Sequence, residues 1–329
     1  MRKQALFAGA GLILLFILFL LELSTGSLII PFQTVWSALW GSRETDAHLV
    51  VSSIRLPRAC IALAVGAGMA VAGACMQALI RNSLASPELL GINSGAALAI
   101  VIAMFVLPAS PLWVYNAAAF AGGLLISAFI FLLASSGHLK LSPLSFIIAG
   151  TAVSLFLGSL TQGVLILNEQ SLDDMRFWLA GSVTGRTFSS FAQILPFIII
   201  GLIGAILLGK RMNALQLGDE MAAGLGESIR MTKGLLYAVA VLLSAACVTT
   251  AGPIAFIGLA VPHLVRSLSG PDYRWIVLHC LWCGAALLMF ADTLGKLVIH
   301  PREVPVGIMT VMLGAPFFIY VARQKDGKL

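Results

Sequence analysis

Charged residues are scarce in this sequence. Asp, Glu, Lys and Arg make up only 10% of the 329 residues, and apolar residues make up 59%. An ordinary soluble domain has about 25% charged residues. The mean hydropathy is +0.99. Because so little polar surface is available to cover the apolar residues, the composition excludes an ordinary soluble fold and indicates a membrane protein.

Groupings of reactive side chains are also lacking. Cys280 and Cys283 form a C-x-x-C pair inside an apolar stretch, but there is no second pair, and the five histidines are dispersed. The stretch from Gly204 to Lys210 resembles a phosphate-binding loop, but Arg211 stands where Ser or Thr would bind magnesium. We therefore expect buried, unpaired cysteines, no metal site, no cofactor, no catalytic residues and no enzymatic activity in this chain.

Long apolar segments are what the sequence does contain. About 20 helical residues cross a bilayer core of about 30 Å. Ten segments are candidates: 5–23, 58–80, 92–107, 112–134, 144–167, 191–208, 234–250, 254–268, 275–299 and 306–322. The sequence predicts an all-α, polytopic membrane protein of about ten transmembrane helices, with residues 1–329 forming a single transmembrane domain.

Two of these segments need comment. The segment 5–23 follows two basic residues, as in a signal peptide, but it has no small-x-small cleavage site, so we expect a first membrane helix. The segment 254–268 is short and contains Pro262, so we expect it to be broken.

The basic residues predict the orientation. With the N-terminus inside, 13 of the 20 Lys and Arg residues fall on the inner side, and basic residues near span ends are retained in the cytoplasm. We expect a multi-pass protein of the bacterial cytoplasmic (inner) membrane, with both termini in the cytoplasm. The lipid bilayer is then its environment, and the net charge of +6 requires no nucleic acid partner.

Small residues recur at helical spacing within the apolar segments. Gly66, Ala70 and Ala74 form one row, and Gly201 with Ala205 forms another. Small residues let helix backbones approach closely inside a bilayer. The rows predict a compact helix bundle.

One inner loop, about 209–233, is long and polar. Asp219 and Glu220 favour the start of a short helix, and Gly224 and Gly226 favour its end. Met221 and Leu225 then share one face. Such an element is either a docking site for a cytoplasmic partner or a surface cap, and these residues alone leave both alternatives open.

A series of short motifs extends over nearly the whole chain after residue 50. In order they are Arg55-Leu56-Pro57-Arg58, Gly73 to Gln77, Arg81-Asn82-Ser83-Leu84-Ala85-Ser86-Pro87-Glu88-Leu89-Leu90-Gly91, Phe177-Trp178-Leu179-Ala180-Gly181-Ser182, Leu217-Gly218 to Gly226, Gly252-Pro253-Ile254-Ala255-Phe256-Ile257-Gly258-Leu259, Pro262-His263, Arg302-Glu303-Val304-Pro305-Val306-Gly307 and Leu313-Gly314-Ala315-Pro316. Together they resemble the FecCD-type permeases of the iron-siderophore and vitamin B12 class of ATP-binding-cassette (ABC) importers.

The resemblance implies an assembly and a substrate. Two permease subunits, identical or related, would surround a path, with two cytoplasmic ABC ATPase subunits that hold ATP and magnesium and with an extracytoplasmic substrate-binding protein. The substrate would be an iron(III)-siderophore complex, with cobalamin or haem as the alternative.

The resemblance also implies three sets of functional residues. ATPase coupling would use Leu217, Gly218, Asp219, Glu220, Ala222, Ala223, Gly224, Leu225 and Gly226. Docking of the binding protein would use Arg55, Arg58 and Lys296. Arg302 is added to this set because it lies with Lys296 near the outer end of the ninth segment, so that two separated basic patches are expected on the outer face. The inner gate would include Ser142, Pro143 and Ser145, and the helix at about 144–167 would line the path.

Two competing interpretations remain. The outer basic residues could instead anchor to lipid phosphates or pair with acids such as Glu303 and Asp292. The protein could also be an ion-coupled secondary transporter, which often binds its coupling ion at carboxylates inside the membrane. Asp292 is the one clearly intramembrane acid, and Lys296 follows it at i+4. This spacing favours an internal ion pair over an ion-binding carboxylate.

Overall fold

The computed structural model describes residues 2–41, 45–136, 143–167, 175, 178–299 and 302–326. Within these ranges every regular element is a helix. The longer ones are α1 (Arg2–Ser24), α4 (Leu56–Ile80), α5 (Ile92–Val106), α6 (Leu112–Ser136), α7 (Pro143–Ile166), α9 (Phe188–Gln216), α11 (Ile229–Ala251), α12 (Ile257–Ser269), α13 (Tyr273–Val298) and α14 (Val306–Asp326). The short ones are α2 (Phe32–Leu39), α3 (Asp46–Val50), η1 (Val51–Arg55), η2 (Pro87–Leu90) and α10 (Asp219–Gly224).

Each of the ten predicted apolar segments overlaps one of the longer helices. Seven helices in the described residues have the length and hydropathy to cross a membrane. Helix α5 and the apolar part of α14, Val306–Pro316, are shorter. Helix α12 has 13 residues, or about 20 Å at 1.5 Å per residue. It is therefore too short for a full crossing, as expected, and it begins after a turn in which Phe256 has a φ of +70°.

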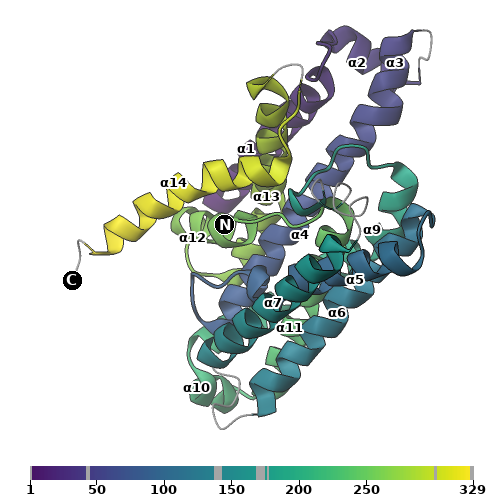
Figure 1. The fold of residues 1–329 in the computed structure, drawn as a ribbon. Helices are drawn as coiled ribbons and strands as arrows, with labels where there is room; N and C mark the ends of the chain where they lie inside the picture. Colours follow the sequence, from purple (N-terminus) through teal and green to yellow (C-terminus); the bar gives the residue numbers. More distant parts are fainter. Residues whose placement is uncertain are drawn as a thin grey trace.

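Helix α4 is the centre of the bundle. Nearly all of its side chains are buried, and it packs against α13, α11, α12 and α9 (Figure 1). The predicted rows of small residues lie at helix crossings, one between α4 and α13 and the other between α9 and α11. A Cβ added to Gly66 would clash with the backbone of Gly284 on α13, and one added to Gly201 would clash with Leu243 on α11. The compact packing predicted from small residues is confirmed at these two crossings.

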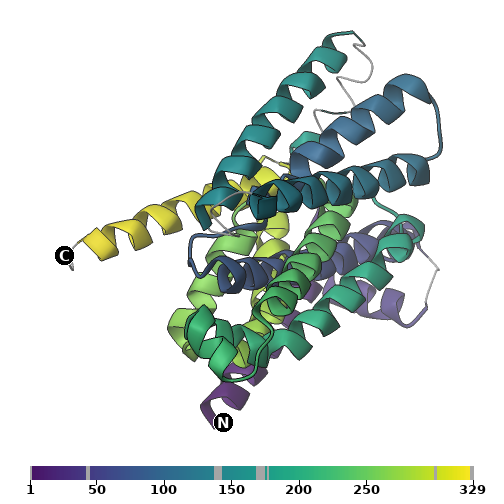
Figure 2. The ribbon, with the colours of Figure 1, turned by 90° about the horizontal axis from the view of Figure 1, so that it is seen from below.

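Helices α5, α6 and α7 form a second group beside this centre. Helix α5 contacts both α6 and α7, and α6 also contacts α11. Figure 2 shows α6 and α7 at one side of the molecule, and α14 extending away from the body toward the C-terminus. Many large apolar side chains of α6 and α7 are exposed. These surfaces face lipid or another subunit, because the chain itself does not cover them.

The cysteines and the polar loop can be compared with what the sequence predicts. All five cysteines are free, and Cys280 is buried within α13. The polar loop predicted at 209–233 is shorter than expected, because α9 continues to Gln216 and α11 already begins at Ile229. The segment between the two helices is 217–228, which contains α10 and is called the coupling segment below.

Candidate functional site

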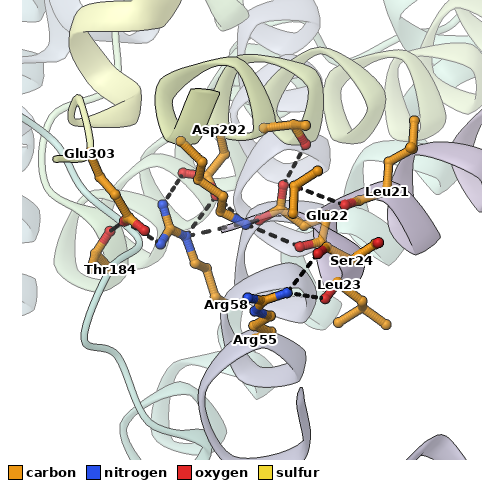
Figure 3. Close-up of polar contacts among 12 residues, drawn as sticks. Leu21, Glu22, Leu23, Ser24, Arg55, Arg58, Thr184, Asp292 and Glu303 are labelled. Atoms are coloured by element: carbon orange, nitrogen blue, oxygen red, sulfur yellow. Dashed lines mark hydrogen bonds and ion pairs between the residues drawn. The ribbon is translucent and has the colours of Figure 1, made fainter. Parts of the chain in front are cut away.

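A buried ion cluster joins the last turn of α1 to α4 and α13. Helix α3, the π-helical turn η1 and α4 form one continuous helix from Asp46 to Ile80, and η1 ends at Arg55. π-Helical turns are rare and frequently occur at functional sites. The turn lies immediately before Arg58, whose side chain reaches α13, while Arg55 reaches the end of α1 (Figure 3).

Arg58 is bound on two sides by carboxylates. Its Nε lies 2.7 Å from Asp292 Oδ2 and its Nη2 lies 3.0 Å from Asp292 Oδ1, which makes a bidentate pair. Its Nη1 donates to Glu303 Oε2 at 2.6 Å. Glu303 also accepts from Thr184 Oγ1 at 3.4 Å, and its loop is held to α13 by the hydrogen bond from Val304 N to Gly295 O. Arg58 therefore links α4 to both α13 and the loop before α14.

Lys296 extends the cluster to α1. Its Nζ contacts Glu22 Oε1 and lies 3.5 Å from Asp292 Oδ2. Thr293 Oγ1 donates to Glu22 Oε2 at 2.7 Å. Glu22 is fully buried, and Arg58 Nε lies 3.9 Å from its Oε1. The two acids and two cations at the centre of the cluster thus neutralise one another.

Arg55 stabilises the C-terminal end of α1. Its Nη1 donates to the carbonyl oxygens of Leu23 and Ser24, each at 2.8 Å, and its Nη2 donates to that of Leu28. The last carbonyls of a helix have no partner within the helix and carry partial negative charge. Arg55 supplies both the missing donors and the complementary charge.

The structure corrects the expected placement of the outer basic residues. Arg55, Arg58 and Lys296 are only 6%, 7% and 3% exposed. Arg58 and Lys296 are paired with buried acids, and Arg55 binds the carbonyl oxygens at the end of α1, so they do not form two separated, exposed patches. The alternative, pairing with Asp292 and Glu303, is the arrangement observed for Arg58. Arg302 is exposed. Docking of a binding protein at these residues stays a prediction.

The Asp292–Lys296 ion pair predicted from the i+4 spacing is confirmed. Glu22 was missed as a second partner of Lys296. The available signal was an acid near the end of an otherwise apolar helix, since such acids are costly unless paired. No carboxylate at the centre of this cluster lacks a cation, which leaves none free to bind a coupling ion. Within the described ranges there is also no group of acids, histidines and cysteines able to hold a metal ion.

The coupling segment lies at the other end of α4. Helix α10 begins at Asp219 and ends at Gly224, as predicted. Asp219 pairs with Lys233 at 2.7 Å and with Arg81 at 3.3 Å. Glu227 pairs with Arg211 of α9 at 3.7 Å. These ion pairs fix α10 against the ends of α4, α9 and α11.

Apolar side chains of the coupling segment are left uncovered by the chain. Leu217, Met221 and Leu225 are 52%, 61% and 66% exposed. The spacing of four residues places Met221 and Leu225 on one face of α10, and Leu217 precedes that helix. Glu220 and Ala223 are exposed beside them, whereas Ala222 is fully buried. Ala222 therefore supports α10 from within and is not available to a partner, contrary to the expectation.

The glycines of this segment differ from one another. Gly218 has a φ of +103° and Gly226 a φ of +84°, conformations that favour glycine. Gly224 is helical, and a Cβ added there would meet no atom within 4 Å. The turn thus depends on Gly226 and not on Gly224, which corrects the expected role of Gly224. Its surface position still leaves room for close approach by a partner.

The predicted inner gate is only partly described. Ser142 lies outside the described residues, Pro143 is the first residue of α7, and Ser145 is half-buried in the first turn. The role of these residues stays a prediction.

Helix α7 carries a weakly polar stripe. Thr151, Ser154, Gly158 and Gln162 follow at helical spacing on one face. Thr151 and Gln162 are exposed, and a Cβ at Gly158 would meet nothing within 4 Å. A small cavity of about 170 Å³ lies along Gly158 and Gln162 beside Asn93 of α5. Exposed polar groups are unfavourable against lipid, so this face suits a water-accessible surface.

Comparison with known proteins agrees with this geometry. The Fe(3+)-citrate import system permease protein YfmD of Bacillus subtilis (strain 168) is 42% identical over 88% of this chain and 84% of its own length. The hemin transport system permease protein HmuU of Yersinia pestis is 40% identical, covering 98% of this chain and 97% of its own. The ferric enterobactin transport system permease protein FepD of Escherichia coli (strain K12) is 38% identical over 95% and 94%.

A solved structure has the same fold. It is an inward-facing conformation of a transporter assigned to the metal-chelate type of ABC transporters. It matches with a TM-score of 0.85 and 25% sequence identity over 97% of this chain and 99% of its own. The model of the FecCD transport family matches residues 14–324. A match over nearly the full length, together with these relatives, shows that the chain belongs to the FecCD transport family.

Proposed function

We propose that this protein is the transmembrane permease subunit of an ABC importer that moves an iron(III)-siderophore complex into the cytoplasm. The observation that carries the proposal is the family match over residues 14–324, with relatives 38–42% identical that are named as permeases for iron chelates or hemin. The membrane-spanning helices and the paired, inaccessible intramembrane acids support a permease over an ion-coupled carrier.

ATP hydrolysis then takes place on a separate cytoplasmic ATPase, which contacts the coupling segment. Support comes from the apolar side chains of Leu217, Met221 and Leu225, which the chain leaves exposed. Ion pairs from Asp219 and Glu227 connect the coupling segment to three membrane helices. A push on α10 by a partner is therefore transmitted to α4, α9 and α11. The surface-cap interpretation does not explain why these apolar side chains are exposed.

The substrate path lies along the polar stripe of α7, against a second permease subunit that is identical or related. The exposed positions of Thr151 and Gln162 support this placement. The inner side is the side of the coupling segment, so both termini lie in the cytoplasm and an extracytoplasmic binding protein docks at the opposite end. Exposed Arg302 is the one predicted docking residue placed to contact such a partner directly.

A bulky residue on the stripe should block transport. In Gly158→Trp the indole enters the open space at Gly158, and uptake of labelled chelate into proteoliposomes should fall to the level of empty vesicles. Gly163→Trp is the matched control, because Gly163 is also on α7 with open space around it but lies away from the stripe. It should transport normally. Equal uptake by the two variants would show that the substrate path does not follow this face of α7.

The substrate class is tested by competition. Proteoliposomes are given ⁵⁵Fe-labelled siderophore and its binding protein, and unlabelled ferric siderophore, haem or cobalamin is added in excess. The proposal expects competition by ferric siderophores alone. Uptake spectra showing haem or cobalamin inside the vesicles, with no ⁵⁵Fe-siderophore transported, would favour the alternative, to which the hemin relative lends support.

A further inference from the structure

A cavity of about 640 Å³, lined mainly by residues with polar side chains, lies beside the coupling segment. It is formed where α4 and α9 end, next to α12 and the turn that leads into α13, and its lining includes Gln77, Arg81, Asn213, Gln216, Arg266 and Asp272. Small-molecule sites commonly have about 300–1,000 Å³ and a few convergent polar groups. None of the roles proposed above uses this cavity.

Arg266 is the cation at its wall that has no acidic partner. Its Nη2 donates to Gln77 Oε1 at 3.2 Å and to the Tyr273 hydroxyl at 2.7 Å, and its guanidinium carbon lies 5.4 Å from the centre of the Tyr273 ring. Both hydrogen-bond acceptors are neutral. In the described part of the chain Arg266 forms no ion pair, and its Nε and Nη1 donate no hydrogen bond. These donors remain for a ligand.

The acid in the same cavity is already neutralised. Asp272 accepts from the backbone N of Arg274 at 3.0 Å, from its guanidinium at 2.8 and 3.2 Å, and from Asn213 Nδ2 at 2.6 Å. Its hydrogen bonds with Arg274 lower the pKa of Asp272 to about 2. Asp272 therefore stays ionised but has its charge balanced by Arg274, and it does not compete for Arg266.

A second guanidinium lies at the rim. Arg81 ends α4 in the left-handed conformation, with a φ of +54° and a ψ of +36°, where glycine is the usual residue. It shares Asp219 with Lys233, which lies closer to that carboxylate. The carbonyl ends of α4 and α9 bring partial negative charge nearby, but Gln216 Nε2 satisfies the carbonyl of Ala78 at 3.3 Å. The full charges available to a ligand are positive.

We propose that this cavity binds an anion through its carboxylate or phosphate groups, with Arg266 as the main contact and Arg81 as a second contact. A guanidinium fork matches the oxygen spacing of carboxylate and phosphate groups. An anion held here competes with Asp219 for Arg81, so it also acts on the contact that fixes α10. The site goes beyond the proposed transport function, and its binding can be measured without transport or ATP hydrolysis.

Calorimetry tests the proposal on the full-length permease in nanodiscs of phosphatidylcholine, with citrate and inorganic phosphate as probes. We expect saturable citrate binding that is about tenfold or more weaker in Arg266→Gln, because one charge-assisted contact is lost. Arg266→Lys keeps the charge and should bind with intermediate strength. Arg230→Gln removes an exposed cation of α11 outside the cavity and should bind like the parent. Thermal unfolding of each variant checks that it is folded.

A lipid arm distinguishes the source of the anion. In nanodiscs that contain phosphatidylglycerol, native mass spectrometry counts the anionic lipids retained by the parent and by Arg266→Gln. If the parent retains the anionic lipid, Arg266→Gln does not, and neither protein binds citrate, the ligand of the site is a lipid phosphate and the proposed anion site is upheld. Equal citrate binding by the parent and a folded Arg266→Gln variant overturns the proposal. So does the lack of binding of citrate, phosphate and phosphatidylglycerol alike.

Discussion

Replacing Asp292 with asparagine should lower the free energy of unfolding by about 3–5 kcal/mol, the usual effect of removing one partner from a buried ion pair. Asp292 is 1% exposed and accepts a bidentate contact from Arg58 while lying 3.5 Å from Lys296. Without its charge, Arg58 loses its bidentate partner and Lys296 keeps only Glu22, so the positive charges of these two buried side chains are less well compensated. The measurement is unfolding by SDS in mixed micelles.

Glu303→Gln is the matched control for Asp292→Asn. Glu303 also contacts Arg58, but its side chain is 29% exposed, so water replaces part of the lost interaction and the loss should be smaller. A double variant, Arg58→Met with Asp292→Leu, should recover part of the stability lost in Asp292→Asn, because it removes both charges together. Equal losses for Asp292→Asn and Glu303→Gln would show that the cluster does not depend on Asp292.

Gly224→Val should abolish coupling to the ATPase while leaving the permease folded. The added side chain meets no atom of the chain within 4 Å, and valine is tolerated in a helix at least as well as glycine. Bulk at this exposed position of α10 therefore interferes only with a partner that approaches closely. We expect the ATPase to be lost on co-purification, or ATP hydrolysis to become insensitive to substrate and uptake to fall to the level of empty vesicles.

Gly234→Val is the control for Gly224→Val. Gly234 is also helical, in α11, and also has open space where a Cβ would lie, but it is outside the coupling segment. This variant should co-purify with the ATPase and transport normally. Normal coupling in Gly224→Val would contradict docking at α10 and would favour the interpretation of the coupling segment as a surface cap. Loss in both variants would point to a general effect of valine at exposed glycines.

Features that depend on neighbours along the chain could be predicted from the sequence. The ten apolar segments each overlap a helix, α10 begins at Asp219 and ends at Gly224, and Asp292 pairs with Lys296 one turn away. Helical spacing alone determines these relations. The row that includes Gly66 was predicted to pack closely, although its partner on α13, Gly284, was not identified.

Features that depend on distant segments could not be predicted. Arg58 and Asp292 are 234 residues apart, and Lys296 and Glu22 are 274 apart. The sequence places basic residues at the outer ends of helices, and they would be exposed there unless acids from other helices were brought to them. The packing of α1 and α13 on α4 brings Glu22 and Asp292 to these basic residues, and this packing cannot be read from the sequence. The burial of Ala222 has the same origin, because it depends on how α10 lies against α9 and α11.

The most direct test of the account is the energy source of uptake. The permease is reconstituted in proteoliposomes with its ATPase, and ⁵⁵Fe-siderophore and the binding protein are supplied outside. The account predicts uptake that requires ATP on the ATPase side, stops with a non-hydrolysable ATP analogue and is unchanged when an uncoupler collapses the proton gradient. Uptake without ATP that follows an imposed proton gradient would contradict it.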